Sequence, residues 1–109
     1  MKPYPKQGSK EKKISIPKLQ SASDYVFSLY IRLKYTDESG GGICVSSGNY
    51  TKWEAVNCGH YIPRGKLQYR YDERNCHLQS VGDNKYKSGN IPHYRKFIED
   101  TYGVEVERE

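Results

Sequence analysis

The chain has 109 residues, a length that fits one small domain with a modest buried core. Its net charge of +5 is unevenly placed: residues 1–20 hold six lysines and one glutamate, and residues 52–96 hold nine basic and four acidic residues. No apolar run is long enough to cross a bilayer, and the lysine-rich start lacks the apolar core of a signal peptide, so both segment types are excluded. The two cationic regions suit a polyanionic partner, with ordinary solvated surface charge as the alternative.

The cysteine pattern indicates a reducing environment. Three cysteines, Cys44, Cys58 and Cys76, make an odd number without a closely spaced pair. A disulfide scaffold is therefore not expected, and reduced thiols in a cytoplasmic protein are the default. For Cys58 and Cys76 the favoured interpretation is small buried apolar side chains, although they could also face each other across a hairpin.

The first part of the chain divides into a tail and a helix. Residues 1–20 are polar, lysine-rich and carry three prolines, so we expect a flexible, disordered basic tail followed by a single folded domain over residues 21–109. Ser21 to Asp24 offer N-capping side chains, and Val26, Phe27, Tyr30 and Ile31 share one helical face. This spacing predicts a helix over residues 22–36, which a glycine-rich loop ends.

Short strands and two helices are predicted for the remainder. Residues 43–46 and 50–53 read as strands around a turn, and the alternation over residues 56–62 predicts a half-buried strand. A basic, aromatic loop should lead to a returning strand at residues 74–79, followed by a short helix at 83–88. Asn90 can cap a last helix that Gly103 ends, with Ile91, Tyr94, Phe97 and Ile98 on one apolar face. The predicted class is α+β.

Three polar residues in this β–β–α order carry the chemistry: His60, Asn75 and Asn84. A strand-bound histidine can act as a general base near neutral pH, with a carbonyl on the opposing strand as its orienting partner. The Asn75 side chain can tie the hairpin together, and an amide oxygen of Asn84 can ligate a hard cation. Taken singly, each is more often structural: a satisfied histidine, a turn residue and a helix cap. The ordered triple within a basic region instead predicts a one-metal HNH-type nuclease.

Basic side chains surround these positions and are the predicted contacts to DNA phosphates. They are Arg64, Lys66, Arg70, Arg74, Lys85 and Lys87.

Three segments give the chain a specific resemblance. They run Gly59-His-Tyr-Ile-Pro-Arg64, Tyr71-Asp-Glu-Arg-Asn-Cys-His77 and Asn84-Lys-Tyr-Lys-Ser-Gly-Asn90. Together they resemble the bacteriophage lambda NinG family, also called Rap recombination endonucleases. The resemblance implies a small HNH-like ββα-metal core with a preceding helix and a C-terminal helix, and cleavage of branched DNA such as Holliday junctions during phage recombination. It also implies that His60 is the base, Asn75 the middle asparagine and Asn84 the helical metal ligand.

The chain departs from that family at its zinc knuckles. The family pattern has two Cys-x-x-Cys pairs, whereas this chain has Cys44 with Ser47 and Ser80 with Asp83. A tetrahedral structural zinc needs four good donors, so no structural zinc is expected. We expect these four residues to lie close together nevertheless, because the fold is shared.

The catalytic metal predicted by this pattern is Mg²⁺ or Mn²⁺, and the sequence does not decide which residue is its second protein ligand. Gly59 occupies the position before His60 where many HNH sites place a ligand. Asp83, next to Asn84, is the first candidate, and Ser88, His77 and His93 are the others.

The leading interpretation is therefore a metal-dependent DNA endonuclease of phage or prophage origin that acts in the bacterial cytoplasm. A catalytically silent DNA-binding module with the same fold is the alternative, and a protein-interaction domain with a lysine tail is a weaker third. Resolution of a junction needs two nearly symmetric cuts, so a homodimer is expected if junctions are the substrate, with the face of Val26, Phe27, Tyr30 and Ile31 as its surface or as core.

Overall fold

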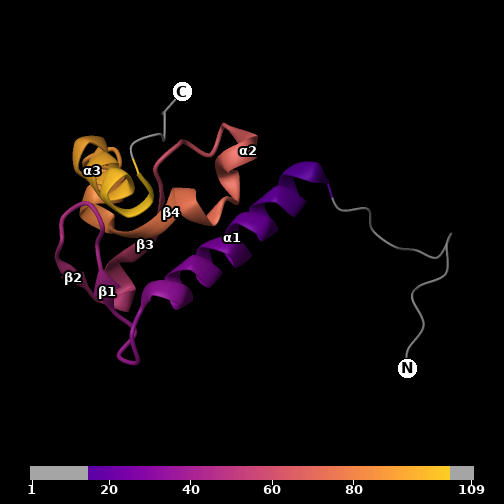
Figure 1. Cartoon of the computed structure of the whole chain (residues 1–109). Coiled ribbons are helices and arrows are strands. Elements are labelled where there is room, and N and C mark those ends of the chain that lie inside the picture. The colour runs from indigo at the N-terminus through magenta and orange to yellow at the C-terminus, as the bar shows by residue number, and fades with distance from the viewer. Residues whose placement is uncertain (1–14, 104–109) are drawn as a thin grey trace, which may run out of the picture.

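The computed structural model describes residues 15–103, which form a long first helix, two short antiparallel hairpins and a closing helix (Figure 1). The predicted α+β class is confirmed. Residues 1–14, which hold most of the predicted basic tail, and residues 104–109 lie outside the described part. Within residues 15–103, no helix is long and apolar enough to cross a membrane.

The first helix, α1, spans Ile16–Tyr35. Its N-cap is Ser15, whose hydroxyl accepts a hydrogen bond from the Lys18 amide at 3.3 Å, and a proline in the first turn suits this start. The prediction that the helix begins at residue 22 was wrong, because Ser21 to Asp24 lie inside the helix and do not cap it. Asp24 instead accepts hydrogen bonds from residues that are distant in sequence.

The central hairpin pairs β3, Val56–His60, with β4, Cys76–Ser80, in antiparallel register from Val56 opposite Ser80 to His60 opposite Cys76. One face, with His60 and its even-numbered neighbours, packs against α1. The other face meets the last helix, where Tyr94 donates a hydrogen bond to the Gly59 carbonyl at 2.7 Å. The strand predicted as half-buried is thus covered on both faces (Figure 1).

The space around Gly59 is too small for any side chain at this position. A Cβ added there would lie 2.0 Å from the Gln79 side-chain oxygen. Gln79 cannot easily move, because its fully buried amide donates to the Ser46 hydroxyl at 2.8 Å and to the Gly89 carbonyl at 2.7 Å. Glycine is therefore required directly before His60.

The smaller hairpin is shorter than predicted. It consists of β1, Gly42–Ile43, and β2, Tyr50–Thr51, and a 3₁₀ turn at Trp53–Ala55 leads from it into β3. The turn between the strands holds Cys44 and Ser46, and the Val45 amide donates to the Leu78 carbonyl of β4 at 3.0 Å. This bond fixes the turn beside the central hairpin.

The connection from β3 to β4 is more ordered than the predicted loop. It contains one helical turn, α2, at Leu67–Arg70, and a 3₁₀ turn at Glu73–Asn75 that ends directly before β4. The helix predicted at 83–88 is a single π-helical turn, η3, at Gly82–Tyr86. Because the 3₁₀ turn ends at Asn75 and β4 begins at Cys76, Asn75 precedes the strand that it was predicted to begin.

The last helix, α3, spans Ile91–Tyr102 and ends at Gly103, as predicted. Gly103 has a φ of +97°, a conformation that glycine adopts easily. Asn90 does precede the helix, but its side chain makes no capping hydrogen bond. The apolar face packs in a core formed by Tyr61, Ile62, Tyr94 and Ile98.

Candidate active site

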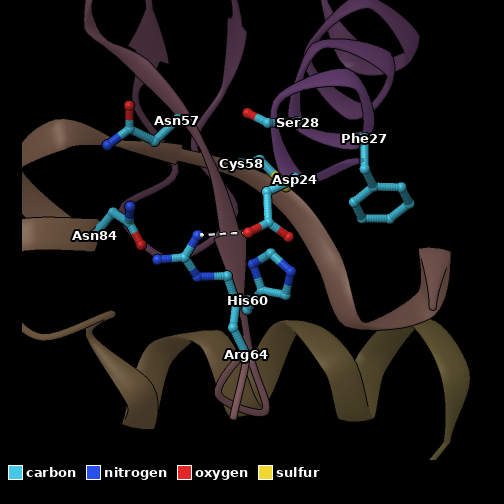
Figure 2. A pocket seen from close by; sticks show the side chains of 8 residues that line it. All are labelled: Asp24, Phe27, Ser28, Asn57, Cys58, His60, Arg64 and Asn84. Carbon is cyan, nitrogen blue, oxygen red and sulfur yellow. Dashed lines mark ion pairs between the residues drawn. The ribbon is translucent and has the colours of Figure 1, made fainter. Parts of the chain in front are cut away.

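A polar pocket of about 340 Å³ opens where α1 crosses the central hairpin. Figure 2 shows side chains from α1, β3, the loop after β3 and η3 around it. The lining residues are Asp24, Phe27, Ser28, Asn57, Cys58, His60, Arg64 and Asn84. Two of the three predicted catalytic residues, His60 and Asn84, thus share one pocket, although they come from different elements.

His60, the last residue of β3, is held in a defined orientation. Its Nε2 lies 2.8 Å from the Arg70 carbonyl oxygen, and its ring is 6.4 Å from the Phe27 ring, between centroids. Burial lowers the pKa of His60 and the nearby Arg64 charge adds to this, whereas the Arg70 carbonyl opposes it. A neutral imidazole that donates Nε2–H to this carbonyl keeps a lone pair on Nδ1, as a general base requires. The carbonyl belongs to α2, so its predicted place on the opposing strand was wrong.

Asn75 lies outside the pocket and holds the connection between the strands. Its Oδ1 accepts from the Ile62 amide at 2.7 Å, and its Nδ2 donates to the Ile62 carbonyl at 2.9 Å and to the Tyr69 carbonyl at 3.2 Å. The predicted tie across the hairpin is therefore present. Because Tyr69 is adjacent to Arg70, Asn75 also fixes the segment whose carbonyl orients His60.

Asp24 is the residue that the sequence did not indicate. Among the described residues that line the pocket, it carries the only carboxylate. It accepts hydrogen bonds from the Arg70 guanidinium and the Tyr71 hydroxyl, and Arg64 lies 3.6 Å away (Figure 2). The hydrogen bond from Arg70 is the main cause that lowers the pKa of Asp24 to about 2. A signal was present in the sequence: Asp24 lies one and two turns before Phe27 and Ile31, on the same helical face.

The predicted candidates for a second metal ligand do not line this pocket. Asp83 is buried elsewhere, and Ser88 is exposed on the turn after η3. His77 lies on the α3 side of the hairpin, between the Tyr94 and Tyr102 hydroxyls. His93 is exposed and bonds to Asn90. Asp24 instead lines the pocket.

The former knuckle, defined as Cys44, Ser47, Ser80 and Asp83, lies at the opposite end of the hairpin. These four residues do lie together, as predicted. The Cys44 sulfur is 3.8 Å from the Ser80 hydroxyl and 3.8 Å from the Asp83 carboxylate, and it accepts from the Ser47 amide at 3.4 Å. The Ser47 hydroxyl points out to the Asn49 amide. The hydroxyl that faces Cys44 and Asp83 belongs to Ser46 instead.

The Asp83 carboxylate is the centre of this cluster. It accepts from the Ser46 hydroxyl at 2.6 Å and from the Asn90 amide at 2.9 Å. Burial alone would raise the pKa of Asp83, but the bonds from Asn90 and Ser46, together with Lys87, outweigh it and lower the pKa. Hydrogen bonds therefore fill the position where the family resemblance predicts zinc ligands.

The predicted phosphate contacts fall into two groups. The Arg70 guanidinium is occupied by contacts within the protein, because it donates hydrogen bonds to the Asp24 carboxylate and to the Arg64 carbonyl. The others are exposed, and Arg64 among them reaches the pocket itself. The exposed residues are Arg64, Lys66, Arg74, Lys85 and Lys87.

Comparison with known proteins identifies the family. The family described as Bacteriophage Lambda NinG protein matches residues 5–108. The chain belongs to the NinG family. It is 42% identical over 66 residues to Protein ninG of Enterobacteria phage H19B, a match that covers 58% of this chain and 31% of that protein. Protein ninG of Salmonella phage P22 is 41% identical over 64 residues, covering 56% and 30%.

Protein ninG of Escherichia phage lambda is 39% identical over 66 residues, which cover 58% of this chain and 31% of that protein. The match thus spans about a third of the length of these curated NinG relatives. No solved structure matches the chain significantly.

Proposed function

We propose that this NinG-family chain is a metal-dependent DNA endonuclease of the HNH type. The observation that carries the proposal is the shared pocket of His60 and Asn84, with Asn75 holding the connection that orients His60. Three residues with separate places in the sequence thereby form one arrangement suited to hydrolysis of a phosphodiester.

In this proposal His60 activates the attacking water. Its Nδ1 accepts the proton, and the Arg70 carbonyl stabilises the resulting imidazolium through Nε2–H. Arg64 lies at the pocket with its side chain 59% exposed, so it can bind a phosphate while it remains close to Asp24. Arg70 holds the Asp24 carboxylate in place.

The pocket residues offer oxygen donors to a hard cation such as Mg²⁺ or Mn²⁺. Such ions prefer oxygen ligands and are commonly bound by one or two carboxylates or amides together with water and substrate phosphate. The Asn84 amide oxygen and the Asp24 carboxylate are the protein donors that would hold the ion. When bound, it would neutralise charge on the scissile phosphate and the leaving oxygen.

Branched recombination DNA is the proposed substrate, cut inside the bacterial host by two copies of the chain. Exposed basic residues around the pocket would bind the phosphate backbone. The α1 residues predicted for dimerisation differ in exposure. Val26 and Tyr30 are exposed, whereas Ile31 is buried. Phe27 packs against the rings of His60 and Tyr71. A dimer on α1 would therefore use Val26 and Tyr30.

A catalytically silent DNA-binding module is the second candidate. It is favoured by the loss of thiols at the former knuckle, where Ser80 and Asp83 stand. In that case the basic surface would act without the His60 pocket.

A cleavage assay on a labelled four-way junction separates the two candidates. We expect cleavage in Mg²⁺ or Mn²⁺ by the full chain, and impaired cleavage by Asn84→Ala that excess Mn²⁺ partly restores. Binding of the junction without cleavage in either metal would select the silent module. Light scattering with and without the junction tests the dimer, and a monomer in both conditions would contradict it.

A further inference from the structure

Cys58, His60 and Cys76 form a cluster that the proposed nuclease chemistry uses only through His60. The register places His60 opposite Cys76, and Cys58 lies two residues before His60 on the same face of β3. One ligand atom from each residue lies within 4.8 Å of the other two. Two sulfurs and an imidazole nitrogen thus converge beside the pocket.

This donor set suits a soft or borderline metal ion rather than Mg²⁺. Zinc is bound by cysteine sulfur at about 2.3 Å and histidine nitrogen at about 2.0–2.1 Å, so tetrahedral ligand atoms lie roughly 3.5–4 Å apart. The three ligand atoms lie within 4.8 Å of one another, so they need to approach by roughly 1 Å to reach that geometry. Thiolates select such ions over the hard cations that oxygen ligands prefer.

The cluster has a buried side and an open side. Cys76 is fully buried, whereas Cys58 and His60 line the solvent-connected pocket. An ion could therefore enter from the pocket and keep a fourth position for water or a phosphate oxygen.

We propose that Cys58, His60 and Cys76 bind one zinc-type divalent ion, and that this ion inhibits the nuclease by occupying the imidazole of His60. The inhibitory half rests on the proposed function, whereas the binding half does not. A coordinated imidazole donates its lone pair to the metal and cannot accept a proton from water. The site is distinct from the cluster around Asp83, because it consists of Cys58, His60 and Cys76 and lies at the pocket end of the hairpin.

Cobalt titration of the reduced full-length chain tests the binding half. We expect one Co²⁺ per chain, with thiolate charge-transfer absorption in the near ultraviolet and visible bands typical of tetrahedral Co²⁺, and displacement by Zn²⁺. Cys58→Ser and Cys76→Ser should each weaken binding at least tenfold. Cys44→Ser is the matched control, because Cys44 is a buried thiol outside the cluster and should leave binding unchanged.

Three results would overturn the site: no thiolate absorption in the wild type, unchanged binding in Cys58→Ser, or loss of binding in Cys44→Ser with the fold intact by circular dichroism. Should Cys76→Ser fail to fold, Cys58→Ser decides alone, since Cys58 is only partly buried.

Inhibition is measured separately, as the ratio of junction cleavage in Mg²⁺ with and without one equivalent of Zn²⁺. We expect a fall of at least tenfold for the wild type and a much smaller fall for Cys58→Ser relative to its own zinc-free rate. Cleavage that continues at full rate with zinc bound would refute inhibition. A chain that never cleaves would refute the nuclease proposal, while the cobalt result would still decide the site.

Discussion

The two carboxylates at opposite ends of the central hairpin differ in what surrounds them. Asp83 is only 3% exposed and receives hydrogen bonds from neutral donors, Ser46 and Asn90. Asp24 is held by the cationic side chains of Arg70 and Arg64 and borders an open pocket. Both have a lowered pKa, but the only cation near Asp83 is Lys87 at 3.9 Å among the described residues, whereas Asp24 is hydrogen-bonded to Arg70 and also lies 3.6 Å from Arg64.

This difference separates a structural polar site from one that can change partners. The buried Ser46 hydroxyl and the partly buried Asn90 amide satisfy Asp83, and these bonds join the turn at Cys44 to η3. Arg64 has an exposed side chain, so an incoming phosphate can compete with Asp24 for it. Substitutions at the two ends should therefore affect different properties, stability at one end and activity at the other.

The largest expected effect is on catalysis at the pocket end. His60→Ala should reduce junction cleavage by about 10²–10⁴-fold, which corresponds to roughly 3–5 kcal/mol of barrier, because the general base is lost. The fold and DNA binding should remain nearly intact, and no metal should restore activity. His77→Phe is the matched control: it alters the other histidine of the hairpin, on the α3 side. Wild-type cleavage by His60→Ala would contradict the HNH-type mechanism.

The pH dependence of stability should come mainly from His77. Burial lowers the pKa of His77 to about 4, below its usual value of 6.5. Between these pH values the unfolded chain binds a proton that the folded chain excludes, so the free energy of unfolding should fall as the pH falls. The loss is roughly 3 kcal/mol across the window. Urea unfolding at several pH values measures it, and His77→Phe should flatten most of the slope, with a remainder from His60. An unchanged slope in His77→Phe would assign the effect elsewhere.

Several of these features could be predicted from the sequence, and others could not. The strands, α3 and its end at Gly103 follow from local periodicity and a glycine stop, which a single segment encodes. The proximity of Cys44 to Asp83 followed only from the family resemblance. The role of Asp24 and the convergence of Cys58 with Cys76 depend on the crossing of α1 and on strand register, which are long-range properties.

At the former knuckle we expect a smaller effect, on stability alone. Ser46→Ala should lower the free energy of unfolding by roughly 1–3 kcal/mol, because Asp83 and Gln79 each lose a buried partner. Ser47→Ala is the control, since its hydroxyl points outward, and should change stability by about 0.5 kcal/mol or less. Equal effects in chemical denaturation would show that the cluster does not stabilise the fold.

The smallest expected effect concerns DNA affinity. Arg64→Gln should lower the slope of log affinity against log salt concentration by about 1, as expected when one phosphate contact is removed. Arg95→Gln is the comparison, because Arg95 is an exposed arginine of α3 that pairs with Glu99. Fluorescence anisotropy with a labelled junction at several salt concentrations measures both. A slope that changes equally in the two variants would indicate a diffuse charge effect rather than a contact at the pocket.

The close approach of Gly59 and Gln79 restricts which sequences this site can evolve through. An acidic or histidine ligand at position 59 would overlap a side chain that is hydrogen-bonded to Ser46 and Gly89. Such a ligand could arise only together with a smaller residue at position 79, and that exchange would weaken the opposite end of the hairpin. Positions 59 and 79 should therefore co-vary among relatives. While Gln79 is present, position 59 cannot supply a metal ligand, so in the proposed Mg²⁺ or Mn²⁺ site the carboxylate would come from outside the hairpin, from Asp24.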